Sequence, residues 1–224
     1  MPLQIAIDGP VASGKSTVAR LLAERLHCTF LDTGALYRAV ALTVMQRGVS
    51  PDDERTVASL VAISDPKVIL DAKAPLGYRI RIGGRILTDE LFTPAVSQAV
   101  SAIAANAKVR THLIDAQRSF ADDRDVIMAG RDIGSVVLPA AKFKFFLTAT
   151  VDARVDRRLR ELHDKGIVIE RDTLKSEIER RDERDRTRKA SPLVMAPDAI
   201  AVDSSALTIE QVVDLLEAKV REAP

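Results

Sequence analysis

A glycine-rich stretch near the start of the chain carries the clearest chemical signal in the sequence. The phosphate-binding pattern G-x-x-x-x-G-K-[ST] is matched by Gly9, Pro10, Val11, Ala12, Ser13, Gly14, Lys15 and Ser16. In such a loop the backbone N–H groups surround nucleotide phosphates, the lysine neutralises the β and γ oxygens, and the last hydroxyl is a ligand for Mg²⁺. We therefore expect a nucleoside triphosphate at residues 9–17, with Thr17 included and Ser16 as the metal ligand.

A phosphate-binding loop alone does not distinguish a kinase from a GTPase or a mechanical ATPase. The sequence has no Asn-Lys-x-Asp motif, which would read guanine. It also has no run of four apolar residues that ends in an acidic pair, as ABC-type and helicase ATPases have. In a chain of 224 residues, these features favour phosphoryl transfer to a small acceptor.

Two further groups of polar residues follow predicted strands and are candidates for the acceptor site. Thr33, Tyr37 and Arg38 follow the strand expected at 29–31, and Arg131 and Asp132 follow the one expected at 126–129. Ligands of parallel α/β sheets gather beyond the carboxyl ends of the strands, and the planar fork of arginine suits a phosphate. The alternatives are a capped helix with a solvated arginine for the first group and a weak surface ion pair for the second.

The densest run of charge covers residues 180–189. On a helix, four of its residues share one face at i, i+3, i+4 and i+7 spacing, namely Arg181, Arg184, Asp185 and Arg188. The residues expected to point elsewhere, in ordinary surface ion pairs, are Arg180, Asp182, Glu183 and Arg186. Beside two polyanions the cationic face would clamp a transition state. The alternative is a solvated, charge-laced helix.

A second arginine-rich helix is expected to begin near residue 152, after a strand at 144–147. Its arginines are Arg154, Arg157 and Arg158. We expect these side chains to cover the donor nucleotide.

The apolar pattern predicts how these groups are positioned. A short apolar run at 3–7 ends in a turn, and apolar residues then recur every three or four positions from Ser16 onward, which is typical of a helix. With the strand at 29–31, this start predicts a parallel sheet flanked by helices. Further strands are expected at 125–129, 144–147 and 200–202, and one long alanine-rich helical stretch at 96–120.

Residues 64–88 interrupt the α/β pattern. Polar and apolar residues alternate at 78–82, and Gly83-Gly84 separates this run from a second apolar run, which indicates a β-hairpin. We predict a small antiparallel insert at 64–88 within a core made of 1–63 and 89–224.

Composition excludes several classes of protein. Hydrophobic residues make up 46% and charged residues 29%, as in an ordinary globular chain, and no window approaches a membrane span. A formal charge of +1, 4% aromatic residues and no Trp argue against nucleic acid as a partner. One cysteine, Cys28, permits no internal disulfide, which indicates the cytoplasm.

Together these motifs resemble the bacterial cytidylate kinases, and the resemblance runs nearly end to end. It is carried by Ile-Asp-Gly-Pro at 7–10, Asp-Thr-Gly-Ala-Leu-Tyr-Arg at 32–38, Gly-Arg-Asp-Ile-Gly at 130–134 and Arg-Asp-Glu-Arg-Asp-Arg-Thr-Arg at 181–188. The loop departs slightly, since it reads Pro-Val-Ala-Ser where Pro-Ala-Gly-Ser is commoner. The resemblance implies an α/β P-loop kinase with a five-stranded parallel sheet, a monophosphate-binding insert, a short lid near 154–170 and a monomeric state.

The resemblance also implies roles for individual residues. Cytosine would be read by Ser101, Arg110 and Asp132, and ribose by Arg181 and Asp185. The acceptor phosphate would be held by Thr33, Tyr37, Arg38, Arg131 and Arg188. The charge on the transferring phosphoryl group would be stabilised by Lys15, Arg131, Arg184 and Arg188.

The expected reaction is attack by a phosphate oxygen of CMP or dCMP on the γ-phosphorus of Mg·ATP. Two rivals remain open. One is a kinase for UMP, AMP or another small metabolite, and the other is a nucleotide-switched binding protein whose arginines contact a partner.

Overall fold

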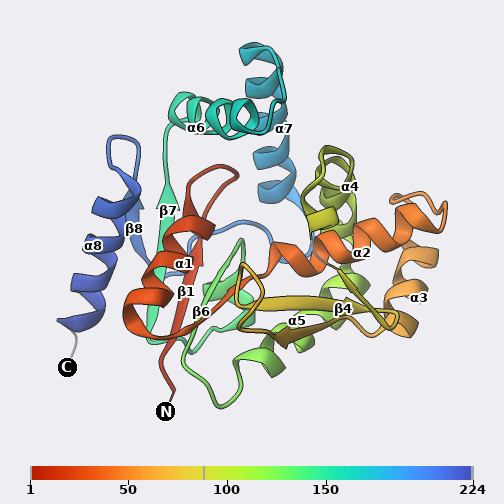
Figure 1. Ribbon diagram of the computed structural model, residues 1–224, viewed down its shortest axis with the longest axis horizontal. Coiled ribbons are helices and arrows are strands. Elements are labelled where there is room, and N and C mark those ends of the chain that lie inside the picture. Colours follow the sequence, from red (N-terminus) through yellow and green to blue (C-terminus); the bar gives the residue numbers. More distant parts are fainter. Residues whose placement is uncertain (1, 88, 223–224) are drawn as a thin grey trace.

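A five-stranded parallel sheet forms the centre of the computed structural model, which describes residues 2–87 and 89–222 (Figure 1). Its strands are β1 (Gln4–Asp8), β2 (Thr29–Asp32), β6 (Val126–Gly130), β7 (Phe143–Thr148) and β8 (Ile200–Asp203). They lie in the order β2-β6-β1-β7-β8, and each neighbouring pair is parallel. The five predicted strands and the parallel sheet are confirmed.

Helices flank the sheet. Their bounds are α1 (Lys15–Leu26), α2 (Gly34–Gln46), α3 (Glu54–Ser64), α4 (Pro94–Ala105), α5 (Ala107–Ala121), α6 (Val151–Asp164), α7 (Arg171–Thr187) and α8 (Ile209–Arg221). Two short turns are also helical, the 3₁₀ turn η1 (Asp89–Phe92) and the π-helical turn η2 (Ile133–Val137). In the part of the chain that the structure describes, no helix is both long and apolar enough to cross a membrane.

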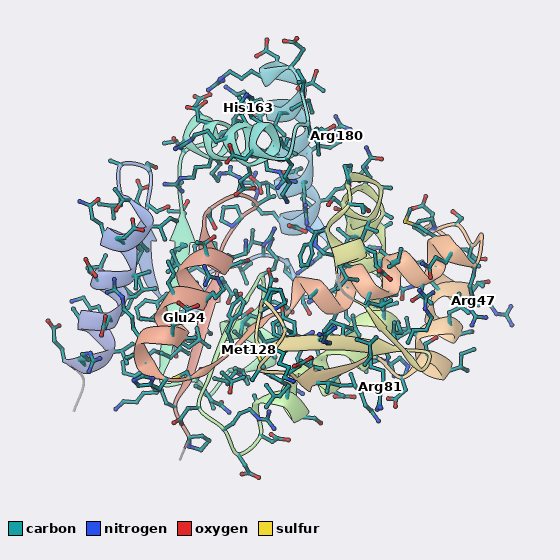
Figure 2. All side chains as sticks on the ribbon, viewed as in Figure 1. Glu24, Arg47, Arg81, Met128, His163 and Arg180 are labelled. Atoms are coloured by element: carbon teal, nitrogen blue, oxygen red, sulfur yellow. The ribbon has the colours of Figure 1, made fainter. Side chains whose placement is uncertain are left out.

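The central strands are buried because their residues are apolar on both faces. Ile5, Ile7, Ile127 and Met128 are all fully buried, as expected for strands covered by helices on either side. Figure 2 shows Met128 in the interior, whereas Arg47, Arg81, His163 and Arg180 lie at the periphery.

The single helical stretch predicted at 96–120 is wrong. Helix α4 ends at Ala105, and Asn106 takes an extended conformation with φ −71° and ψ 113°. Its side-chain oxygen accepts hydrogen bonds from the N–H groups of Lys108 and Val109, and its amide donates to the carbonyl of Glu54 at 2.9 Å. Asparagine satisfies the first N–H groups of α5 better than it continues α4, so two helices form.

A three-stranded antiparallel sheet occupies most of the predicted insert. Its strands are β3 (Lys67–Leu70), β4 (Tyr78–Ile82) and β5 (Arg85–Leu87), in that order. The predicted hairpin is confirmed: Gly83 and Gly84 join β4 to β5 with φ 56° and 78°, values that glycine adopts without strain.

The buried face of this sheet packs against α2 and shares one continuous hydrophobic cluster with the main core. Tyr78, Ile80 and Ile82 point into that cluster, while Arg79 and Arg81 alternate with them on the other face. The boundaries 64–88 and the surrounding core remain predictions. Thr88, which ends the predicted insert, lies outside the described residues, as do Met1, Ala223 and Pro224 at the predicted ends of the core.

Helices α6 and α7 form a separate pair at the top of Figure 1. They pack on each other around a small hydrophobic cluster of Val155, Leu162, Leu174 and Ile178. The predicted lid near 154–170 falls on α6 and the residues after it, and its role as a lid remains a prediction.

Candidate active site

A cavity of about 290 Å³ opens beyond the carboxyl ends of β1, β2 and β6, between the phosphate-binding loop and α7. The predicted site residues that line it are Val11, Ala12, Gly14, Lys15, Ser16, Thr17, Thr33, Tyr37, Arg38, Ser101, Arg110, Arg131, Asp132, Arg158, Arg181, Asp185 and Arg188. Parallel strands that end at one edge bring these distant segments together. Gly9, Pro10 and Ser13 do not line the cavity, although they belong to the same loop.

The phosphate-binding loop has the tight backbone its sequence predicts. At Gly9, with φ 156°, an added Cβ would lie 2.1 Å from the carbonyl oxygen of Leu147, so only glycine fits. Gly14 is left-handed with φ 85° and caps α1, whose first residues Lys15, Ser16 and Thr17 line the cavity.

Lys15 is buried at the start of α1, and its Nζ donates to the carbonyl of Pro10 at 2.9 Å. Burial lowers the pKa of Lys15 well below its ordinary value, and Arg131 and Arg181 lower it further. A bound polyanion would offset both effects. The lysine therefore lies in a site that favours negative charge.

Two ion pairs organise the acceptor side of the cavity. Arg110 forms a buried ion pair with Asp132, and its guanidinium lies 5.2 Å above the centre of the Tyr37 ring. Arg131 donates from Nε to Asp185 Oδ2 at 2.8 Å. The carboxylates thus hold two arginines in fixed orientations. Each arginine also donates to a backbone carbonyl, Arg110 to Ala104 at 3.1 Å and Arg131 to Gly130 at 3.4 Å.

Arg188 bridges these two pairs. Its guanidinium lies 3.8 Å from Asp132 Oδ1 and 3.7 Å from Asp185 Oδ1. Its Nη2 is buried without a hydrogen-bond partner, as are Arg110 Nε and Arg181 Nε. Unpartnered buried donors are costly, so these atoms mark where an anionic ligand would bind.

The cavity carries a clear excess of positive charge. Its lining holds seven cationic side chains, from Lys15 and six arginines, against four carboxylates. Burial lowers the pKa of Arg181 to about 10, and the neighbouring Arg131 contributes to that shift. Although the whole chain is nearly neutral, this cavity suits two polyanions at once.

Asp8 is a buried carboxylate next to the phosphate-binding loop, although it does not line the cavity. It ends β1, directly before the phosphate-binding loop, and its carboxylate accepts from the N–H groups of Ile133 and Gly134, both at 2.8 Å. Burial raises the pKa of Asp8 to about 6. In the sequence Asp8 belongs to the Ile-Asp-Gly-Pro motif at 7–10, but that motif did not indicate its bonds to Ile133 and Gly134.

Several expectations about the arginines are wrong. Arg184 is exposed and does not line the cavity, so it does not share the clamp with Arg181. Helix α7 ends at Thr187, and Arg188 has ψ 140°, so it reaches the cavity from extended backbone and not from a fourth helical position. Asp182, which was expected at the surface, is buried.

Two arginines of α6 bind protein atoms where the nucleotide was expected. Arg154 is buried and pairs with Asp182 at 2.5 Å. Arg157 donates to the hydroxyl of Ser204 at 3.0 Å and also to its carbonyl. Only Arg158 of the three lines the cavity.

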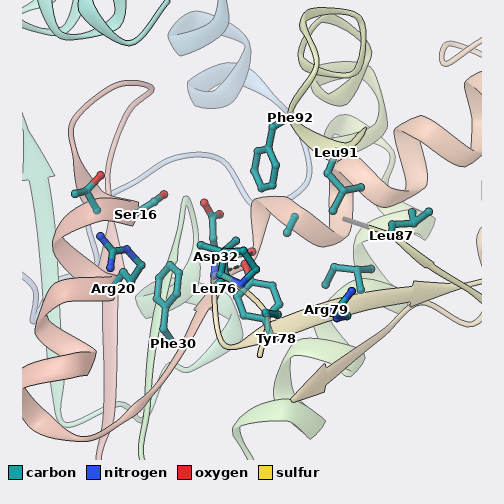
Figure 3. Close-up of a pocket in the computed structure, with 15 residues that line it drawn as sticks. Ser16, Arg20, Phe30, Asp32, Leu76, Tyr78, Arg79, Leu87, Leu91 and Phe92 are labelled. Carbon is teal, nitrogen blue, oxygen red and sulfur yellow. Dashed lines mark hydrogen bonds between the residues drawn. The ribbon is translucent and has the colours of Figure 1, made fainter. Parts of the chain in front are cut away.

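A second cavity, of about 380 Å³, adjoins the first and separates α1 from the antiparallel sheet (Figure 3). Phe30, Leu76, Tyr78 and Phe92 make its walls mainly apolar. Asp32 lines both cavities, as do Ser16 and Thr17. The space keeps the small sheet apart from the phosphate-binding helix.

Metal ligands from the protein alone are few. Across residues 2–87 and 89–222, no three His, Cys, Asp or Glu side chains gather so that they could hold a metal ion. Ser16 and Asp32, however, face the same space in Figure 3. A hydroxyl and a carboxylate fit Mg²⁺, which is usually bound through one or two protein oxygens, waters and substrate phosphates.

Comparisons with known proteins agree with this geometry. A cytidylate kinase of Enterococcus faecalis is 43% identical over 220 residues, covering 98% of this chain and 96% of that protein. One of Pelotomaculum thermopropionicum is 44% identical over 216 residues, covering 96% and 95%. The solved structure of a shikimate kinase from Bacteroides thetaiotaomicron covers 99% of both chains with a TM-score of 0.50 and 13% identity, a likeness of fold alone.

The cytidylate kinase family itself matches residues 5–222. The resemblance inferred from the motifs is therefore confirmed across nearly the whole chain, and this chain belongs to the cytidylate kinase family.

Proposed function

We propose that the chain transfers the γ-phosphoryl group of Mg·ATP to CMP or dCMP, giving ADP and CDP or dCDP. The observation that supports this proposal is a single cavity lined by Lys15 and also by Arg131 and Arg188, which would form one anion subsite each for donor and acceptor. Such an arrangement holds two mutually repelling phosphates in line, which is the main task of a phosphoryl-transfer enzyme.

No side chain needs to act as a general base in this reaction. The second pKa of a phosphate monoester is near 6, so the attacking oxygen of the acceptor is already anionic at neutral pH. The protein instead stabilises the charge that spreads over the equatorial oxygens of the transferring group. Lys15, Arg131 and Arg188 are the side chains proposed for that role.

The acceptor nucleotide would meet separate groups of residues at its base, its ribose and its phosphate. Ser101 on α4 and the Arg110–Asp132 pair would contact the cytosine edge, and Arg181 and Asp185 on α7 would contact ribose. The residues proposed for the acceptor phosphate are Thr33, Tyr37, Arg38, Arg131 and Arg188. The buried position of the Arg110–Asp132 pair supports a reading role, because a desolvated ion pair distinguishes donors from acceptors sharply.

Mg²⁺ would accompany ATP, held by Ser16 with Asp32 across the cavity. Its chemistry there would be to neutralise part of the phosphate charge. The ATP contacts would come from the backbone of residues 9–17 and from Arg158.

A substrate panel tests the proposal. ADP formation is measured with ATP and each of CMP, dCMP, UMP and AMP, and we expect it to depend on CMP or dCMP. Slow ADP formation whose rate does not change when any monophosphate is added would instead support a nucleotide-switched binding protein. Faster turnover with UMP or AMP would identify another acceptor.

A further inference from the structure

Val11, in the phosphate-binding loop, is held by the two helices above it through all three of its groups. Its N–H donates to Asp182 Oδ1 at 3.2 Å, and its carbonyl accepts from Arg154 Nη1 at 3.0 Å. Its side chain packs against the small hydrophobic cluster between α6 and α7. In Figure 1 the loop after β1 extends up to these helices.

This contact, which we term the Val11 clasp, consists of Val11, Arg154 and Asp182. Arg154 and Asp182 are paired at 2.5 Å and are only 4% and 5% exposed. Arg154 also donates from Nε to the carbonyl of Ala149 at 3.2 Å. A buried ion pair whose remaining hydrogen bonds are satisfied is rigid, and removal of one partner is costly. The loop and the helix pair are therefore joined as one unit.

Helix α7 also contacts the acceptor side of the cavity. Arg181 precedes Asp182, and Asp185 follows one turn later, and both line the cavity. Asp185 in turn holds Arg131. One helix thus binds the donor loop through Asp182 and the acceptor groups through its neighbours.

We propose that Asp182 is a positioning residue that couples the two substrate sites, so that each nucleotide binds more tightly when the other is present. An acceptor held by Arg181 and Asp185 fixes the position of α7, and the Val11 clasp transmits that position to the phosphate-binding loop. The coupling is reciprocal, because two ligands that favour the same arrangement strengthen each other equally. The inference rests on the proposed function, since it takes CMP as the acceptor.

The test uses ADP and CMP, which cannot react because no γ-phosphoryl group is present. Calorimetry gives the dissociation constant of ADP alone and at saturating CMP, and the ratio of the two is the coupling factor. We expect a factor of about 5 or more in the unmodified chain. In Asp182→Asn, which keeps the size of the side chain but not its charge, we expect the factor to fall to about 1.

Two further variants make the test specific. Glu183→Gln changes a neighbouring, exposed carboxylate of α7, and its coupling factor should be unchanged. Val11→Ala removes the packing against the α6–α7 cluster but retains both backbone hydrogen bonds, so the factor should fall about twofold or more. Thermal unfolding checks that each variant is folded. If Asp182→Asn does not fold, the coupling factor of Val11→Ala decides whether the inference holds.

Three results would overturn the inference. A coupling factor near 1 in the unmodified chain would contradict it, while the proposed function would stand if both nucleotides bind. A uniform loss of affinity in Asp182→Asn with an unchanged factor would assign Asp182 a purely structural role. Failure of CMP to bind the unmodified chain would overturn the proposed function and this inference together.

Discussion

Arg131 Nε and Asp185 Oδ2 lie 2.8 Å apart although 54 positions separate them in the sequence. The bond joins the turn after β6 to α7. Burial alone would raise the pKa of Asp185, but Arg131, Arg181 and Arg188 together hold it below its ordinary value. The carboxylate therefore remains ionised at neutral pH and keeps Arg131 directed along the cavity, where a flexible arginine would lose entropy on binding a phosphate.

Arg188→Ala should lower kcat far more than it raises the KM for ATP. The side chain lies between Asp132 and Asp185 with an unpartnered Nη2, where the transferring group and the acceptor phosphate would meet. An interaction made mainly in the transition state affects kcat, and a loss on the order of 10³-fold is expected for such an arginine.

Arg186→Ala is the matched control for that variant, because Arg186 is exposed and only pairs with Glu183 at 3.5 Å. Its steady-state constants should match those of the unmodified chain. If Arg188→Ala retained the kcat of the unmodified chain and only its thermal stability fell, Arg188 would not stabilise the transition state and its contacts would have a purely structural role.

Lys15→Ala should remove phosphoryl transfer from a folded protein. Lys15 belongs to the loop that would surround the phosphates. Because its loss removes a cation that stabilises the transition state, we expect kcat to fall by a factor on the order of 10³. Circular dichroism and the rate of ADP formation with ATP and CMP provide the measurement. Lys219→Ala, in the last turn of α8 and outside the lining of the cavity, serves as the control. Near-normal turnover in Lys15→Ala would contradict the assignment of the donor site.

The sequence predicted the sheet, the loop and the hairpin because each rests on local chemistry. The phosphate-binding loop needs glycine at fixed positions, and the turn at Gly83-Gly84 needs left-handed backbone, which glycine adopts readily. Both features can therefore be recognised from a few consecutive residues. At Asn106 the local cap on Lys108 and Val109 is reinforced by a hydrogen bond to Glu54, a residue 52 positions away that the local pattern does not reveal. Periodicity alone favours a continuous helix there.

The same limit explains the errors in the arginine-rich run. Asp182 was expected at the surface, where the usual partner of a helical carboxylate is water. The structure instead places the phosphate-binding loop and α6 there, so Asp182 is buried against Val11 and Arg154. Which charged residue of a helix becomes buried is decided by the neighbours that the fold supplies.

Asp8 should make the stability of the protein depend on pH in a recognisable direction. Its folded-state pKa of about 6 lies above the ordinary value of 3.8 because the buried carboxyl resists ionisation. The folded state therefore binds the proton more tightly than the unfolded state between these values, and stability decreases as the pH rises from about 4 to about 6. A shift of that size corresponds to about 3 kcal/mol at most.

Asp8→Asn isolates this contribution, since an amide does not titrate. The free energy of unfolding in urea, measured for both proteins from pH 4 to pH 7, should show the unmodified chain losing stability relative to the variant across that window. Asp8→Asn also alters the two hydrogen bonds from Ile133 and Gly134, so we expect a constant offset between the two stability curves as well. Parallel curves would mean that Asp8 keeps an ordinary pKa.

The choice of cytosine over uracil should depend on Asp132. A carboxylate accepts a hydrogen bond from the exocyclic amino group of cytosine but meets the O4 acceptor of uracil with repulsion. Asp132 is held in place by Arg110, so it has little freedom to turn away from the wrong base. A good base-edge contact contributes roughly 1–3 kcal/mol of discrimination, which is about 5- to 150-fold in kcat/KM.

Asp132→Asn keeps the shape of the side chain and an oxygen for Arg110, but its amide N–H groups can donate to O4 of uracil. We therefore expect kcat/KM to fall steeply for CMP and to fall much less, or to rise, for UMP, so that the ratio between them narrows by about 5- to 150-fold. If Asp132 served only to orient Arg110 and Arg188, both substrates would lose activity by the same factor. The two values of kcat/KM, measured on one preparation of Asp132→Asn, decide between these roles, because an unchanged ratio excludes base reading by Asp132 while the kinase assignment still stands.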